Sequence, residues 1–120
     1  LPFHIEWSTV CTYILHNLNT YWRTWAFDPR YILALRTDWA IEWSVLGILR
    51  LHYSLQTNRM TSKVGAGEYG LQTLYPNWHR LIQEALRLRH KQPRSHYRFR
   101  LHRTIEVLRF LRMVIRDIDL

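Results

Sequence analysis

Residues 43–88 read WSVLGILRLHYSLQTNRMTSKVGAGEYGLQTLYPNWHRLIQEALRL, and this block decides the fold. An apolar stretch with helical periodicity ends in a polar connection over residues 56–60. Thr61-Ser62-Lys63 then opens a second helix, with Ser62 placed as its N-cap and Leu74 near its end. Pro76 interrupts the chain, and Asn77 is placed to cap a third helix over 78–91. The block therefore predicts three helices joined by short turns.

The helix that opens this block begins earlier, and Asp38 is its predicted N-cap. One apolar stripe runs along it: Ile41, Val45, Ile48, His52 and Leu55, widened by Trp39, Leu46, Leu49 and Tyr53. A stripe this wide predicts a central, mostly buried helix. Within it, His52 is expected to be a core histidine with satisfied hydrogen bonds.

The flanking segments are also predicted to be helical. Ser8 or Thr9 can cap a first helix that runs to about Ala26, and Asp28-Pro29 then breaks the chain. A short helix is expected over 30–36.

After the loop at 92–94, Ser95 is the predicted cap of the last helix. Its expected stripe is Tyr97, Leu101, Ile105, Leu108, Ile115 and Ile118, and a second apolar side holds Val107, Phe110, Leu111 and Val114. No segment alternates with period two for long enough to predict a strand. We therefore expect an all-α fold, a single bundle of five to six helices.

The composition predicts one folded domain. The chain has 120 residues, 48% of them hydrophobic, and starts at Leu1, so it reads as a piece of a longer protein. No apolar run approaches the roughly 20 residues of a membrane span, and no signal-peptide layout is present, so no membrane partner is expected. The single Cys11 cannot form an internal disulfide, which favours a cytoplasmic location.

The net charge is +8, and most of the excess arginine follows Trp78. Such a charge favours an anionic partner: nucleotide phosphate, nucleic acid or an acidic surface. A solvated arginine-rich face would give the same composition.

Two apparent motifs predict no chemistry. Residues 65–70 fit the G-x-G-x-x-G pattern of dinucleotide-binding proteins, but no strand precedes them and position 90 is His rather than an acid. We interpret them as helix-packing glycines. Asp117 and Asp119 resemble a magnesium-binding pair, yet on a helix they diverge by about 200°. They are interpreted as a chance match or a frayed helix end.

Thr61-Ser62-Lys63 is the motif that does predict binding. A helix N-terminus has free N–H groups and about half a positive charge, so it attracts phosphate. A lysine in the first turn opposes that dipole, and a residue placed against its local preference indicates function. Lys63 and Ser62 are therefore candidate contacts to an anion.

The stretch over 39–89 resembles the C-terminal helical domain of bacterial aminoglycoside adenylyltransferases of the streptomycin/spectinomycin type. The pattern R-x-x-Y-x-L-x-T, which begins at Arg50, adds to the resemblance. The resemblance implies that Lys63 contacts nucleotide phosphates. A nucleotide-contacting tyrosine of the family is replaced here by Arg89, which could pair with phosphate. Asp38 and Glu42, with Trp39 between them, match the region that helps to bind the cationic drug.

The resemblance also implies ATP and Mg²⁺ as cofactors of the parent protein. In that family, a preceding nucleotidyltransferase domain holds magnesium and the catalytic carboxylates. We thus expect residues 1–120 to be an accessory domain that helps to position ATP and a small acceptor. No catalytic or metal-ligating residue is expected in it, and it should be inactive alone. The alternatives are a small basic helical module that binds nucleic acid and a helical scaffold without a ligand.

Overall fold

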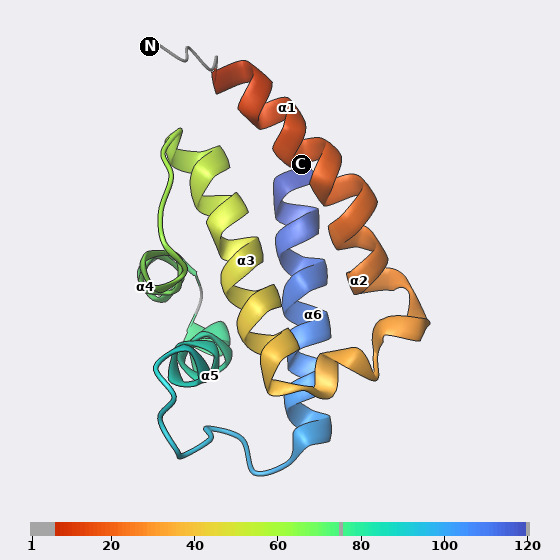
Figure 1. The fold of residues 1–120 in the computed structure, drawn as a ribbon, viewed down its shortest axis with the longest axis vertical. Helices are drawn as coiled ribbons and strands as arrows, with labels where there is room; N and C mark the ends of the chain where they lie inside the picture. Colours follow the sequence, from red (N-terminus) through yellow and green to blue (C-terminus); the bar gives the residue numbers. More distant parts are fainter. Residues whose placement is uncertain (1–6, 75, 120) are drawn as a thin grey trace.

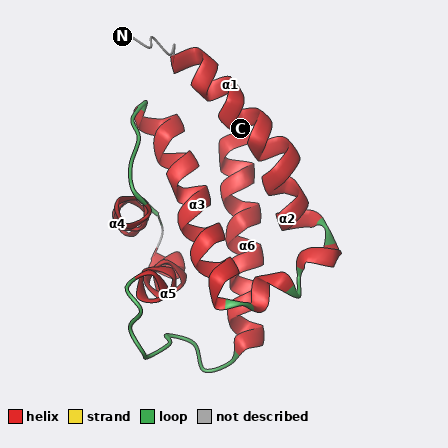
Figure 2. Cartoon of the chain, viewed as in Figure 1, coloured by secondary structure: helices red, strands yellow, loops and turns green. Residues whose placement is uncertain are grey.

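The computed structural model of the chain describes residues 7–74 and 76–119. Over these residues the chain is all-α, as predicted, with helices at Trp7–Asn17 (α1), Arg23–Phe27 (α2), Asp38–Thr57 (α3), Lys63–Thr73 (α4), His79–Arg89 (α5) and Arg100–Asp119 (α6). Short 3₁₀ turns cover Pro29–Tyr31, Ala34–Arg36 and Pro76–Trp78. No strand occurs in this part of the chain, and loops join the helices (Figure 2).

Helix α3 lies at the centre of the bundle, and α6 runs beside it (Figure 1). Most of the predicted stripe is buried, since Ile41, Val45, Ile48 and Leu49 have no exposed surface. Its ends are not, because Trp39 is 65% exposed and Leu55 is partly exposed. The predicted cap is wrong by one residue, because Thr37, not Asp38, accepts the amide of Ala40 at 3.2 Å. Asp38 is instead the first helical residue, and its carboxylate accepts a hydrogen bond from Arg103. The helix ends at Asn58, which adopts the left-handed conformation with φ of 57°.

The N-terminal segment forms one long helical arm with an irregular middle. A π-helical turn at Leu18–Trp22 joins α1 to α2. Because Trp7 is already helical, Ser8 and Thr9 lie inside the helix and do not cap it. The break at Asp28-Pro29 is confirmed, and the carboxylate of Asp28 caps the 3₁₀ turn that follows. The predicted short helix over 30–36 consists of two such turns.

Helix α4 packs closely on α5 and α3 through its glycines. A Cβ added to Gly67 would lie 2.6 Å from Leu86 Cδ2, and one added to Gly70 would lie 2.9 Å from Ile82 Cδ1. Real Cβ contacts are almost never that short, so a larger residue would force these side chains to shift. The interpretation as helix-packing glycines is therefore confirmed for Gly67 and Gly70, whereas a Cβ on Gly65 would meet Thr61 and Ser62 of the preceding turn.

The ends of α5 and α6 differ from the prediction. Trp78, rather than Asn77, stands at the N-cap position of α5, because residues 76–78 form a 3₁₀ turn. Ser95 does not cap α6, which begins at Arg100. Its hydroxyl lies instead within a hydrogen-bonded turn, where it accepts the amide of Tyr97.

The prediction for α6 is confirmed in part. On its second apolar side, Val107, Phe110, Leu111 and Val114 are fully buried. Of the expected stripe, Ile115 is also fully buried, whereas Leu101 is 70% and Ile105 40% exposed. The reason is that Arg103 and Thr104 are buried at the start of this helix, which fixes its rotation. Within the described chain, no helix is long and apolar enough to cross a membrane.

Candidate functional site

Lys63 is the first residue of α4, and Ser62 directly before it caps the helix. Ser62 Oγ accepts the amide of Gly65 at 3.0 Å, as predicted. The cap satisfies one of the free N–H groups of the first turn. Lys63 lines a groove of about 670 Å³ between α1, α3 and the start of α4, called here the Lys63 groove. Among the described residues, Lys63 forms no ion pair, so its positive charge is free to meet an anion.

Arg50 is a second cation of the same groove, and the sequence analysis did not select it as a site residue. It comes from α3, and its Nε donates to the carbonyl of Thr61 at 3.1 Å. This bond ties the guanidinium to the turn that precedes Lys63. Arg50 lines the groove together with Lys63. Its place in the pattern R-x-x-Y-x-L-x-T was the signal that could have identified it.

A stack of tryptophans forms the wall beside these cations. The ring of Trp43 lies parallel to Trp22 on one face, with centroids 5.0 Å apart, and to Trp39 on the other, at 5.7 Å. Trp22 and Trp43 line the Lys63 groove, while Trp39 is 65% exposed. The outer face of Trp39 therefore offers a flat aromatic surface to a planar or cationic group. The backbone of Gly47 leaves room for the stack, since a Cβ there would lie 3.1 Å from the ring of Trp22.

The two predicted acceptor-binding acids each have an arginine partner. Glu42 Oε1 accepts from Arg89 Nη1 at 3.3 Å, and Asp38 Oδ1 accepts from Arg103 Nη2 at 2.8 Å. Arg89 is itself a predicted nucleotide contact, so residues assigned to two different ligands meet each other. Both acids lie in the first turns of α3 near Trp39.

The site residues fall into two groups along α3. Glu42 and Arg50 are eight residues apart, which separates them by about 12 Å along the helix axis. Lys63, Ser62 and Arg50 form the cationic group at one end. Asp38, Trp39 and Glu42, with Arg89, form the other. Trp43, which stacks on Trp39, lies between the two groups along α3.

A buried charge network that the sequence analysis missed supports the acidic end. Glu84 of α5 is fully buried and accepts hydrogen bonds from four groups: the side chains of Arg87, Ser95 and Arg103, and the amide of His96. Burial alone would raise the pKa of Glu84, but these hydrogen bonds outweigh it and lower the pKa to about 2. Arg103 links Glu84 to Asp38 and to the carbonyl of Arg36 at 3.0 Å. The network therefore fixes the start of α3 against α5 and α6.

Residues 7–74 and 76–119 contain no group of three His, Cys, Asp or Glu side chains that could hold a metal ion. The helix continues through Asp119, and the carboxylate of Asp117 lies against His52. The Lys63 groove, in contrast, has two cations that suit phosphate.

The comparison with protein families gives one match. The family model described as "Aminoglycoside adenylyltransferase, C-terminal domain" matches residues 13–114, which include every site residue named above. No curated protein and no solved structure gives a significant match.

Proposed function

Because this chain belongs to the family of aminoglycoside adenylyltransferase C-terminal domains, we propose that it helps to position a nucleotide and a cationic acceptor for adenylyl transfer. The carrying observation is the Lys63 groove, where two cations and a helix N-terminus face one space. The domain supplies binding and charge, and another domain supplies the chemistry.

The phosphates of ATP bind at Lys63 and Arg50 in this proposal. Lys63 has a free ammonium group, and Arg50 is fixed by its bond to Thr61, so little ordering is needed when the anion arrives. The N-terminus of α4 adds a partial positive charge from the free amides of its first turn. Ser62 acts by capping the helix, which holds Lys63 in its place at the edge of the groove.

The acceptor binds at the other end of α3, at Trp39 and Glu42, with Asp38 beside them. Aminoglycosides are polycations, so their ammonium groups suit carboxylates and the face of a tryptophan. In the chain alone, Arg89 and Arg103 neutralise these acids. An acceptor must therefore displace Arg89 from Glu42, and the free chain should bind acceptor weakly.

Arg89 can then change partner. Its ion pair with Glu42 is long and partly exposed, with side-chain exposures of 49% and 22%, so it costs little to break. When a cationic acceptor takes Glu42, the guanidinium of Arg89 is free to contact phosphate. This exchange would favour ATP binding when acceptor is bound, and the reverse.

Magnesium and the catalytic carboxylates belong to a partner nucleotidyltransferase domain in this proposal. Bound Mg²⁺ would neutralise phosphate charge in the complete protein. The described residues contribute the cationic groove, not metal ligands. Alone, the chain should transfer no adenylyl group.

The nucleic-acid alternative is less favoured because much of the basic charge is already paired. Four arginines after Trp78 form ion pairs inside the domain: Arg80 with Glu106, Arg87 and Arg103 with Glu84, and Arg89 with Glu42. A polyanion would therefore have to compete with internal carboxylates for these four arginines.

Calorimetric titration of the chain with adenosine, AMP, ADP and ATP tests the proposal. If phosphate contacts dominate, the affinity rises with each phosphate and falls with added salt. Equal affinities for adenosine and ATP would contradict it. Incubation with ATP, Mg²⁺ and an aminoglycoside should give no adenylylated product, and detection of such a product would refute the accessory role.

A further inference from the structure

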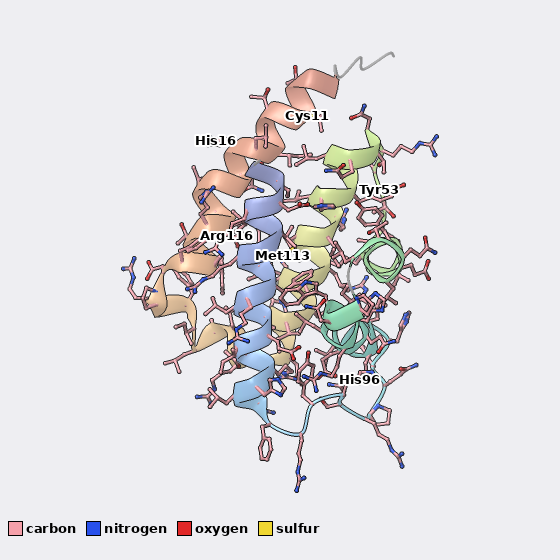
Figure 3. The ribbon with its side chains drawn as sticks, turned by 180° about the vertical axis from the view of Figure 1, so that it is seen from behind. Cys11, His16, Tyr53, His96, Met113 and Arg116 are labelled. Atoms are coloured by element: carbon pink, nitrogen blue, oxygen red, sulfur yellow. The ribbon has the colours of Figure 1, made fainter. Side chains whose placement is uncertain are left out.

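A second pocket lies along α6, on a part of the surface that the proposed function does not use. It has a volume of about 1030 Å³ and lies between α6 and the ends of α3 and α4. This is the size range of sites that take small molecules. It shares no lining residue with the Lys63 groove. We call it the α6 pocket; Figure 3 labels Met113 and Arg116, which come from this helix.

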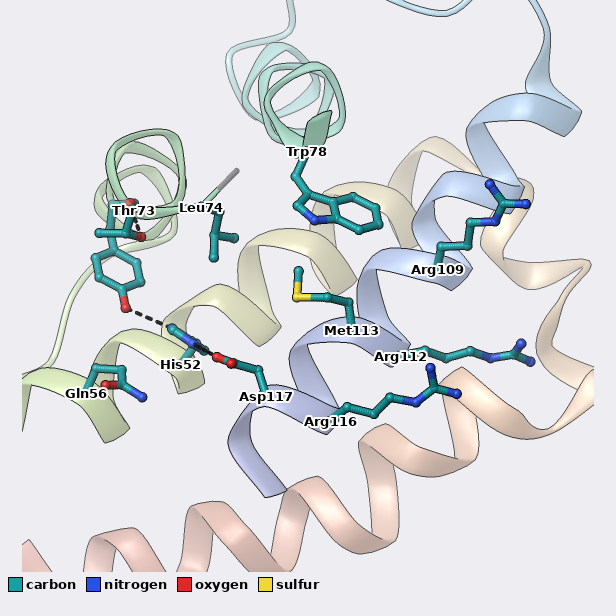
Figure 4. Close-up of a pocket in the computed structure, with 11 residues that line it drawn as sticks. His52, Gln56, Thr73, Leu74, Trp78, Arg109, Arg112, Met113, Arg116 and Asp117 are labelled. Carbon is teal, nitrogen blue, oxygen red and sulfur yellow. Dashed lines mark hydrogen bonds and ion pairs between the residues drawn. The ribbon is translucent and has the colours of Figure 1, made fainter. Parts of the chain in front are cut away.

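Three arginines form one edge of the α6 pocket. Arg109, Arg112 and Arg116 recur at helical spacing and project to the same side of α6 (Figure 4). Arg112 is held in place, since its Nε donates to the carbonyl of Ala26 at 2.8 Å and its guanidinium lies over the ring of Phe27. Over the described residues, Arg109 and Arg116 form no ion pair. An anion entering here would meet donors that no carboxylate neutralises.

The opposite edge carries a fixed polar chain of Tyr69, His52 and Asp117. His52 is 6% exposed, and its Nδ1 and Nε2 lie 2.8 Å from the Tyr69 hydroxyl and the Asp117 carboxylate (Figure 4). A carboxylate only accepts, so Nε2 donates to it, while Nδ1 is hydrogen-bonded to the hydroxyl of Tyr69. Both ring nitrogens therefore have hydrogen-bond partners within the domain, which fixes the imidazole in place. The hydrogen bond to His52 also holds the carboxylate of Asp117, the acidic residue among those lining the pocket, on the side opposite to the arginines. This arrangement favours binding of an anion rather than catalysis.

Between these edges the pocket is apolar. Met113, Leu74 and Trp78 line it, and the ring of Trp78 is supported from behind by Phe110 at 5.5 Å in an edge-on contact. Met113 projects toward the side of His52, opposite to the arginines (Figure 4). A ligand that spans the pocket would therefore place an apolar or aromatic part on Met113 and Trp78 and a charged part on the arginines.

We propose that the α6 pocket binds a small amphipathic anion, an aromatic ring that carries a phosphate or carboxylate. The ring packs on Trp78 and Met113, and the anionic group receives hydrogen bonds from Arg109, Arg112 and Arg116. Guanidinium groups suit such oxyanions because their donors form paired hydrogen bonds. This site is independent of nucleotide binding at Lys63.

Titration of the chain with phenyl phosphate tests the proposal. Calorimetry measures the affinity, and amide chemical shifts of the isotopically labelled chain locate the site. We expect saturable binding that shifts amides of α6 and residues 73–78, and at least about tenfold weaker binding of inorganic phosphate and of phenol, which each lack one part. Binding at the Lys63 groove alone, or equal binding of the three probes, would overturn the proposal.

Variants separate this site from the nucleotide groove. The double variant Arg109→Gln/Arg116→Gln should weaken phenyl phosphate binding about tenfold or more, since two charged hydrogen bonds to the anion are lost. Arg109 and Arg116 are both exposed, and neither forms an ion pair with a described residue, so the fold should persist. Circular dichroism of the double variant checks this. Arg94→Gln, in the loop before α6, and Lys63→Ala should leave the affinity unchanged. An unaffected double variant, or loss of binding in Lys63→Ala, would contradict the assignment.

Discussion

Arg103 and Glu84 form an ion pair in the interior, with Arg103 Nη1 3.0 Å from Glu84 Oε2 and side-chain exposures of 4% and 0%. Removing one charge from such a pair leaves the other buried without compensation. We therefore predict that Glu84→Gln lowers the free energy of unfolding by about 3–5 kcal/mol, measured by urea denaturation. Glu68→Gln, an exposed site on α4, serves as the control. A loss below about 1 kcal/mol at Glu84 would contradict the role of the network.

The same carboxylate makes stability depend on acid. Burial would raise the pKa of Glu84, but hydrogen bonds from Arg87, Ser95, His96 and Arg103 lower it from 4.5 to about 2. A lowered pKa stabilises the fold above the unfolded value, so this contribution is complete above about pH 4.5 and disappears as the pH falls toward about 2. The urea midpoint should therefore fall across this window. In Glu84→Gln the decline should be smaller, and identical profiles would refute the assignment.

Gly70→Ala tests the close packing of α4. Its Cβ would lie 2.9 Å from Ile82 Cδ1 and 3.1 Å from Leu49 Cδ1, and both of these side chains are fully buried. Overpacking of this kind costs about 1–3 kcal/mol, which should exceed the gain of about 1 kcal/mol in helix propensity. Thermal denaturation should show a lower Tm than for Glu68→Ala. A stabilised Gly70→Ala would mean that the helices can separate without cost.

Arg89→Ala tests the exchange of partners at Glu42. Loss of this exposed pair should change the free energy of unfolding by less than about 1 kcal/mol. Because Glu42 is freed, the affinity for an aminoglycoside should rise, and the ATP affinity measured with aminoglycoside bound should fall modestly. Calorimetry with each ligand measures both effects, and Glu42→Gln should remove the gain in acceptor affinity. An unchanged acceptor affinity in Arg89→Ala would argue against competition at this carboxylate.

The sequence predicted those parts of the fold that local chemistry decides. Ser62 caps α4 as expected, and the middle of the apolar stripe of α3 is buried, because capping and periodicity act over a few neighbouring residues. Gly67 and Gly70 were interpreted correctly as packing glycines, because the lack of a preceding strand already argued against a dinucleotide-binding loop. His52 was predicted to be a satisfied core histidine, and its two hydrogen bonds confirm this.

Features that depend on tertiary contacts could not be predicted in this way. No local pattern marks Arg103 and Glu84 for burial, yet they are buried because α3, α5 and α6 meet there. This pairing also rotated α6, so Leu101 became exposed. Arg50 joins Lys63 only because the turn before α4 folds back onto α3. The choice of Thr37 over Asp38 as cap likewise follows from the distant partner of Asp38, Arg103.

The central claim is that Lys63, at the start of α4, binds the phosphates of a nucleotide. Its most direct test is the ATP affinity of Lys63→Ala against the unaltered chain at low salt, with Arg94→Ala as a control of equal charge change. We predict that Lys63→Ala binds ATP more weakly by about tenfold or more, while its affinity for adenosine is unchanged. Arg94→Ala should bind both ligands with the affinity of the unaltered chain. An equal ATP affinity for all three proteins would contradict the account.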